Sequence, residues 1–152
     1  MQYGCTLIAV TDMERSRRFY QDVLGREVIS DFGANVTLTG NIALQTWETW
    51  KEFIHERNIS FGGNAFELYF EEDDIDGFME KLNSMPKIEF VHPLLKHSWG
   101  QRVVRFYDPD HHIIEVGENM DIVIKRFLQS GLSVEETAKR MDVPVEYVQA
   151  KA

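Results

Sequence analysis

The side chains that could carry chemistry in this sequence are carboxylates, a single thiol and five histidines, accompanied by a large supply of aromatic rings. Two carboxylates, Glu67 and Glu115, stand in runs of residues that predict strands, so each can point from the face of a sheet. If they face each other across a cavity, they could bind a divalent metal, or share a proton and act as general acid and base. No glycine-rich phosphate loop, Ser-His-Asp arrangement or Cys-x-x-Cys pair stands out beside them.

These residues follow an internal repeat. Cys5 stands seven residues before Asp12, and Glu67 stands seven residues before Asp74, so the two halves are offset by about 62 residues. Each aspartate can cap a helix, because its short side chain can accept a hydrogen bond from the first turn. Both halves have the order strand-helix-strand-strand-strand. The repeat predicts an α+β fold in which two βαβββ modules form a cupped mixed sheet.

Apolar spacing locates the elements of each half. The first half predicts a helix from Asp12 to Gly25, with strands at about 3–10, 26–32, 34–39 and 41–47. The second half predicts a helix that opens at Asp73 or Asp74 and ends before Pro86, with strands at about 64–71, 88–92, 102–107 and 111–117. The segment 48–60 is ambiguous, since one helical turn could hold Phe53, Ile54 and Arg57.

Composition restricts the partners of the chain. It has 152 residues, 43% hydrophobic and 27% charged, which is typical of a soluble globular protein. The formal net charge of −9 argues against nucleic acid or an anionic membrane as the main partner. The single cysteine cannot form an internal disulfide, and neither a secretory signal nor a spanning apolar segment is found. We therefore expect a cytoplasmic protein.

Residues 119–152 predict a helical tail of a different kind. Apolar residues at helical spacing form a stripe of Val123, Ile124, Phe127 and Leu128, and Ser133-x-x-Glu136 has the pattern of a capping box. Five basic and five acidic residues cancel, and the last helix has no basic residue, which argues against DNA binding. We expect the tail to seal the rest of the chain or to support a homodimer.

Three stretches together resemble the vicinal-oxygen-chelate superfamily, the glyoxalase, bleomycin-resistance and dioxygenase group. They are Val10 to Gly25 with its Ser…Phe-Tyr…Leu-Gly pattern, Glu72 to Asp76, and Phe106-Tyr107-Asp108-Pro109-Asp110 followed by Ile113 to Val116. The resemblance covers about residues 3–118. It implies a domain over 1–118, with modules at about 1–47 and 64–118, and a helical C-terminal extension over 119–152.

The resemblance also implies four positions for metal ligands. They correspond here to Cys5, Gln45, Glu67 and Glu115, and of these Glu115 has the residue type usual in the family. Both histidines usual at the first-strand positions are replaced, which argues against a zinc or nickel glyoxalase site and against an iron site of two histidines and one carboxylate. A divalent metal (Zn, Ni, Fe or Mn) and no cofactor at all are equally plausible. We expect Glu67, Glu115 and Gln45 to point into one cavity.

Further residues could line that cavity. Trp47 and Tyr69 suit a flat or apolar small molecule if they point inward, or else complete the core. His92 and His97 flank the segment before strand 102–107, where the resemblance implies the mouth of the cup. Two functions follow. One is a metal-dependent lyase, isomerase or dioxygenase that uses Glu115 and Glu67; the alternative is a non-catalytic protein that binds or sequesters a drug or aromatic ligand.

Overall fold

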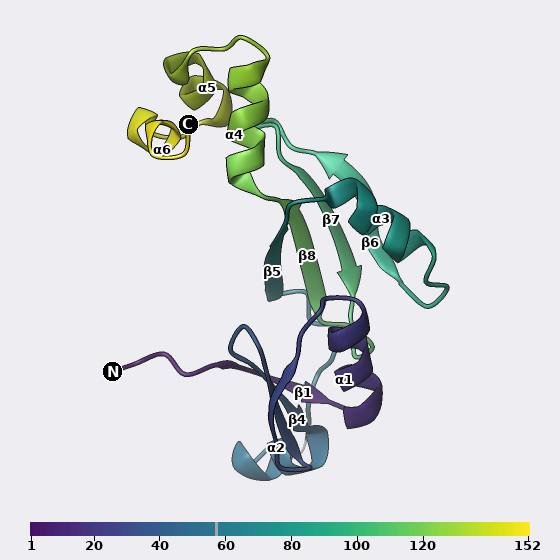
Figure 1. Ribbon diagram of the computed structural model, residues 1–152. Helices are drawn as coiled ribbons and strands as arrows, with labels where there is room; N and C mark the ends of the chain where they lie inside the picture. The colour runs from purple at the N-terminus through teal and green to yellow at the C-terminus, as the bar shows by residue number, and fades with distance from the viewer. Residues whose placement is uncertain (57) are drawn as a thin grey trace. The chain divides into compact units, whose positions relative to one another are not determined.

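The computed structural model describes residues 1–56 and 58–152. It contains two βαβββ modules and a helical tail, so the predicted α+β class is confirmed (Figure 1). The first module comprises β1 (Thr6–Val10), α1 (Met13–Asp22), β2 (Val28–Asp31), β3 (Asn35–Leu38) and β4 (Ile42–Thr46). The second comprises β5 (Glu67–Glu72), α3 (Ile75–Asn83), β6 (Phe90–Lys96), β7 (Arg102–Tyr107) and β8 (Ile113–Glu118). Helix α2 (Trp47–Phe53) lies between the modules in sequence.

Each module forms its own four-stranded sheet. The strand orders are β1-β4-β3-β2 and β5-β8-β7-β6, with one parallel pair in each, β1 with β4 and β5 with β8. By their contacts the residues fall into two compact units, one of residues 1–66 with 108–112 and the other of residues 67–107 with 113–152. The domain boundary after residue 118 stays a prediction, because contacts alone do not show which part folds independently.

The repeat of capping aspartates is present as expected. Asp12 accepts a hydrogen bond from the backbone N–H of Arg15 at 2.9 Å, and Asp74 accepts one from Gly77 at 2.9 Å. Each of these bonds satisfies one of the backbone donors that a helix leaves unpaired in its first turn. The two local signals therefore determine where α1 and α3 begin.

Several boundaries differ from the expectation. Strand β1 begins at Thr6, which leaves Cys5 exposed ahead of it, and Trp47 begins a helix instead of ending a strand. Strand β6 runs to Lys96 and not to the predicted end at about residue 92, so Pro93 to Lys96 belong to the strand. Proline at position 93 is compatible with this, since β6 is an edge strand and an edge tolerates a missing donor. The expectation for Arg57 lies outside the described residues.

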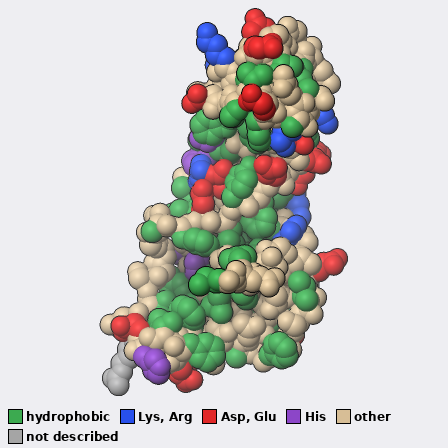
Figure 2. Space-filling view, turned by 90° about the vertical axis from the view of Figure 1, so that its left-hand side faces the viewer, with side chains coloured by type: hydrophobic (Ala, Val, Ile, Leu, Met, Phe, Trp, Pro, Cys, Tyr) green, Lys and Arg blue, Asp and Glu red, His purple; other side chains and the backbone are tan. Residues whose placement is uncertain are grey.

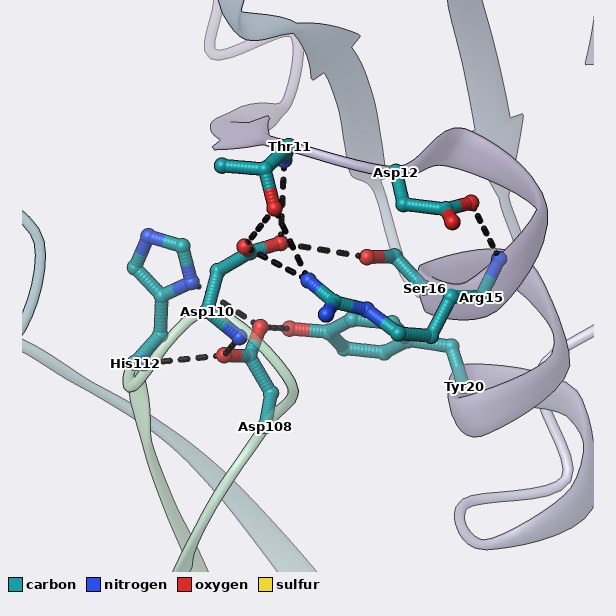
Figure 3. A network of polar contacts seen from close by, with 8 residues as sticks. All are labelled: Thr11, Asp12, Arg15, Ser16, Tyr20, Asp108, Asp110 and His112. Carbon is teal, nitrogen blue, oxygen red and sulfur yellow. Dashed lines mark hydrogen bonds and ion pairs between the residues drawn. The ribbon is translucent and has the colours of Figure 1, made fainter.

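The turn between β7 and β8 is held by two buried aspartates (Figure 3). Asp110, 5% exposed, accepts hydrogen bonds from the backbone N–H of Thr11 at 3.1 Å, from Arg15 at 2.9 Å and from the hydroxyl of Ser16 at 3.3 Å. The hydroxyl of Thr11 donates a further short bond. This carboxylate is therefore fully engaged at the N-terminus of α1, where the helix dipole favours a negative charge.

Asp108 is contacted by the side chains of two ring residues, Tyr20 and His112. The buried hydroxyl of Tyr20 donates to Asp108 at 3.0 Å, and Nδ1 of His112 lies 2.9 Å from the same oxygen. Burial first, and then the charge of Asp108, raise the pKa of Tyr20 well above its usual value, so its hydroxyl keeps its proton and donates. The side chain of His112 remains 19% exposed while its ring contacts this buried carboxylate.

We predict that Asp110→Asn destabilises the protein by about 2–4 kcal/mol, because an amide N–H2 would face donors in place of an acceptor. Thermal unfolding would measure this as a fall in Tm of very roughly 4–16 °C for a chain of this size. Asp22→Asn, an exposed change near the end of α1, is the control. Equal melting temperatures for the two variants would show that the network contributes little.

The tail forms helices α4 (Met120–Gln129), α5 (Val134–Met141) and α6 (Val145–Gln149), which gather at one end of the second sheet (Figure 1). The capping box of Ser133 and Glu136 is confirmed by both of its hydrogen bonds. The apolar stripe of α4 is covered within the chain, in a core with Val123, Ile124, Ala138, Met141 and Val148. The stripe is therefore buried without a second copy of the chain. The homodimer stays a prediction. Among the described residues, no helix has both the length and the apolar character needed to cross a membrane.

A buried carboxylate fastens this tail to the sheet. Glu118, at the end of β8 and 1% exposed, accepts from Arg102 of β7 at 3.0 Å and forms a short ion pair with Arg126 of α4. Burial works to raise the pKa of Glu118, but the hydrogen bonds and charges of Arg126 and Arg102 prevail and lower it below its usual value. Folding therefore favours the charged form.

A depressed folded-state pKa means that Glu118 stabilises the fold above its unfolded pKa of about 4.3 and loses this contribution as the pH falls through the folded value. We predict that Glu118→Gln lowers Tm at pH 7, and that the difference from the wild type shrinks below about pH 4. Thermal melts from pH 7 to pH 3 would measure it. A difference that is independent of pH would contradict the assignment.

Candidate functional site

Four polar side chains form one row across the second sheet. Tyr69 on β5 pairs with Glu115 on β8, Glu115 pairs with Arg105 on β7, and Arg105 pairs with His92 on β6. Directly paired residues share a face, and Glu67, two residues before Tyr69, shares it as well. The sheet therefore gathers four of the predicted site residues around an arginine.

Helix α3 covers the opposite face of this sheet. Phe106 follows Arg105 on β7 and so points the other way, and its ring lies 6.2 Å from the ring of Phe78 of α3. The row of polar side chains is therefore not under α3. On that open face Tyr69 remains 47% exposed, which leaves its ring accessible to a ligand.

Arg105 holds the row together. Its Nε donates to Glu67 at 2.9 Å, its Nη2 forms a very short ion pair with Glu115, and its Nη1 lies 3.3 Å from Nε2 of His92. The side chains of Arg105 and Glu115 are 25% and 9% exposed, whereas that of Glu67 is 38% exposed. Two carboxylates against one guanidinium leave this cluster a formal net charge of −1.

A second set of hydrogen bonds orients Tyr69. The amide of Gln101, itself 5% exposed, donates to the hydroxyl of Tyr69 at 2.9 Å, and that hydroxyl donates to Glu71 at 3.1 Å. The ring of Tyr69 lies over Gly117, where a Cβ would come within 3.1 Å of it. Burial and the neighbouring Glu71 raise the pKa of Tyr69, against the opposing effect of Gln101, so the phenol stays neutral.

A stacked pair of rings stands at the turn after β6. The rings of His97 and Trp99 are 4.0 Å apart and inclined by 11°, and Trp99 Nε1 donates to Gln101 Oε1 at 3.1 Å. Burial, and then the positive charge of Arg105, lower the pKa of His97, which favours a neutral ring at pH 7. Figure 2 views the side of the molecule that carries β5, and there histidine, basic and acidic side chains gather just below the tail.

The other predicted site residues belong to the first unit. Cys5 is exposed ahead of β1. Gln45 is 2% exposed in β4, and its amide is used by its neighbours, since Asn35 donates to its oxygen at 2.8 Å and its nitrogen donates to Thr49. Trp47 begins α2, with the ammonium group of Lys51 3.7 Å from its ring centroid. A cavity shared by Gln45 with Glu67 and Glu115 stays a prediction.

Comparison with known proteins identifies the family. A family model described as a glyoxalase-like domain matches residues 3–121, which is most of the chain. The chain belongs to the glyoxalase-like family. The resemblance to the vicinal-oxygen-chelate superfamily is thereby confirmed.

Relatives of this glyoxalase-like protein are found by sequence and by structure. The uncharacterized protein YraH of Bacillus subtilis (strain 168) is 29% identical over 117 residues, 72% of this chain and 91% of its own. A crystal structure of a protein of unknown function from Agrobacterium tumefaciens strain C58 is 38% identical, with a TM-score of 0.71 over 78% of this chain and 94% of that one. A glyoxalase-related enzyme from Fulvimarina pelagi is 21% identical with a TM-score of 0.68, covering 78% of this chain and 88% of its own, which shows the fold alone.

The family often binds divalent metals, but the residues on the second sheet of this glyoxalase-like protein do not fit one. The carboxylates of Glu67 and Glu115 are both bound to the guanidinium of Arg105, so a cation would have to displace a charge already in place. Within residues 1–56 and 58–152, no three side chains of His, Cys, Asp or Glu are grouped to hold a metal ion. The donor set therefore suits an arginine and not a divalent ion.

Sequence reasoning missed three residues of this site: Arg105, Trp99 and Gln101. A signal existed for Arg105, since it interrupts the otherwise apolar and aromatic run Val103-Val104-Arg105-Phe106-Tyr107. A charged residue in such a strand requires a partner, and the adjacent strand supplies Glu115. Gln101 and Trp99 carried no comparable signal, because their roles depend on a turn that brings them onto Tyr69.

We predict that Arg105→Met lowers stability by about 2 kcal/mol or more, because it leaves the nearly buried Glu115 without its countercharge. Glu67→Gln removes a half-exposed partner of the same arginine and costs less than about 1 kcal/mol. Urea unfolding of both variants would measure the difference. Equal losses, or a smaller loss for Arg105→Met, would contradict the central position of Arg105.

Proposed function

We propose that this glyoxalase-like protein binds a flat, positively charged small molecule on the open face of the second sheet, without a metal ion. The observation that carries the proposal is the pairing of both Glu67 and Glu115 with Arg105. The two positions that supply metal ligands elsewhere in the family are here engaged by a residue of the chain. A binding function that needs no metal is compatible with that pairing.

The charge of the face supports a cationic ligand. The cluster of Glu67, Glu115 and Arg105 has a formal net charge of −1, and the exposed Glu71 adds another negative charge beside Tyr69. An aromatic cation bound there would meet two kinds of attraction. Its charge is favoured by the carboxylates, and its ring can stack on Tyr69 or on the His97–Trp99 pair.

A metal-dependent lyase, isomerase or dioxygenase is the other function that the family allows. One of the solved relatives is named lactoylglutathione lyase, from Agrobacterium tumefaciens, and it is 22% identical to this chain, which shows the fold alone. No contact on the second sheet favours that chemistry over binding, since Glu115 is paired with Arg105. We therefore expect weak classical glyoxalase activity at most. The cytoplasm, a homodimer, and the absence of nucleic-acid or membrane partners are part of the same proposal.

Titration with proflavine, a flat aromatic cation, tests the proposal. We expect saturable binding that quenches tryptophan fluorescence, that is unchanged by EDTA, and that is much weaker for 2-naphthoate, an aromatic anion. Tyr69→Ala should weaken proflavine binding about fivefold or more, which corresponds to about 1 kcal/mol of aromatic contact. Glu48→Gln, an exposed change on α2 of the first unit, is the control.

Three results would contradict the proposal. The wild type would fail to bind proflavine, or it would bind 2-naphthoate equally well, or EDTA would abolish binding and added Zn²⁺, Ni²⁺, Fe²⁺ or Mn²⁺ would restore it. The last result would favour the metal-dependent alternative.

A further inference from the structure

The helical tail lies largely outside the part of the chain that the family shares. The family model ends at residue 121, near the start of α4, so α5 and α6 lie beyond it. Nevertheless the tail contacts the turn between β6 and β7, residues 97–101, which carries the stacked rings of the candidate site. These contacts involve two neighbouring residues of α4, Arg126 and Phe127.

The side chain of Arg126 binds a backbone carbonyl of this turn. Its Nη2 donates to the carbonyl oxygen of Gly100 at 2.7 Å, while its Nη1 is anchored by the buried Glu118. Phe127 packs on the same glycine so closely that a Cβ there would overlap its ring. Gly100 has a φ of +95°, a conformation that favours glycine, so both the backbone and the space at this position are adapted to α4.

The turn links α4 to the candidate site, because it carries His97, Trp99 and Gln101. The backbone N–H of Gly100 donates to His97 at 2.9 Å, and that of His97 donates to Gln101 at 2.9 Å, which closes residues 97–101 into one compact turn. His97 and Trp99 stack on each other from this turn, and Gln101 donates from it to the hydroxyl of Tyr69. A displacement of Gly100 would therefore move His97 and Trp99, and also Gln101, which orients Tyr69.

We infer that the C-terminal extension is part of the ligand site, because Arg126 and Phe127 position the turn of residues 97–101 that carries the stacked rings. The inference rests on the proposed function for the class of ligand, an aromatic cation. The tail thereby sets affinity and selectivity as well as stability. Arg126 and Phe127 are positioning residues, which act on the ligand site through Gly100.

The positioning part is tested without a ligand, by hydrogen exchange of the full chain. Arg126→Met should make the amides of residues 97–101 exchange about tenfold faster or more, because the turn loses its anchor while Glu118 keeps Arg102. Arg126→Lys, which can still donate to one carbonyl, should restore part of the protection. Lys125→Met, an exposed change one residue earlier in α4, is the control. Unchanged exchange in Arg126→Met would overturn the inference.

The ligand part is tested with proflavine on the same proteins. Arg126→Met should weaken binding about fivefold, whereas Lys125→Met should not. Binding that is the same in Arg126→Met as in the wild type would overturn the inference. If the wild type does not bind proflavine, the proposed function fails by itself, and the exchange experiment alone decides whether α4 orders the turn.

Discussion

A carboxylate removed from water must be paired, and the final hairpin of this chain carries four that are at most 7% exposed. Asp108 and Asp110 in its turn are satisfied by residues of α1 and by the turn itself. Glu115 forms an ion pair with Arg105 on the open face, and Glu118 forms ion pairs with Arg102 of β7 and Arg126 of α4. Helix α1, the candidate site and the tail are thus each organised by an anion on the same pair of strands.

The same constraint explains how the site departs from the usual chemistry of its family. A buried Glu115 requires a positive partner, which can be a metal ion or a guanidinium. In this chain the partner is Arg105, which bridges Glu115 and Glu67 and leaves the three side chains with a formal net charge of −1. The face then carries an excess negative charge beside the exposed ring of Tyr69, and the proposed binding of an aromatic cation rests on this combination.

What could be predicted from the sequence was local, and what could not was contact between distant residues. The capping roles of Asp12 and Asp74 depend on bonds to residues three positions away, so spacing alone revealed them. The pairing of the buried Asp108 with Tyr20 depends on a helix that lies about 88 residues earlier in the chain. Arg105 was visible as a charge among apolar residues, but its pairing with Glu67 and Glu115 depends on the register of three strands. The family resemblance supplied the fold and the positions of Glu67 and Glu115.

The attachment of the tail reaches both faces of the second sheet. Glu118 and Glu115 are three residues apart on β8 and therefore point to opposite faces. Glu118, on the α3 side, holds Arg126, and this arginine reaches Gly100 in the turn whose rings stand by the open face. The turn that carries those rings is therefore connected, through Gly100 and Arg126, to an ion pair on the other side of the sheet. A tail that only completed a core would need the apolar stripe of α4, but it would have no need of Arg126 on Gly100, and this contact is the reason to regard the extension as part of the site.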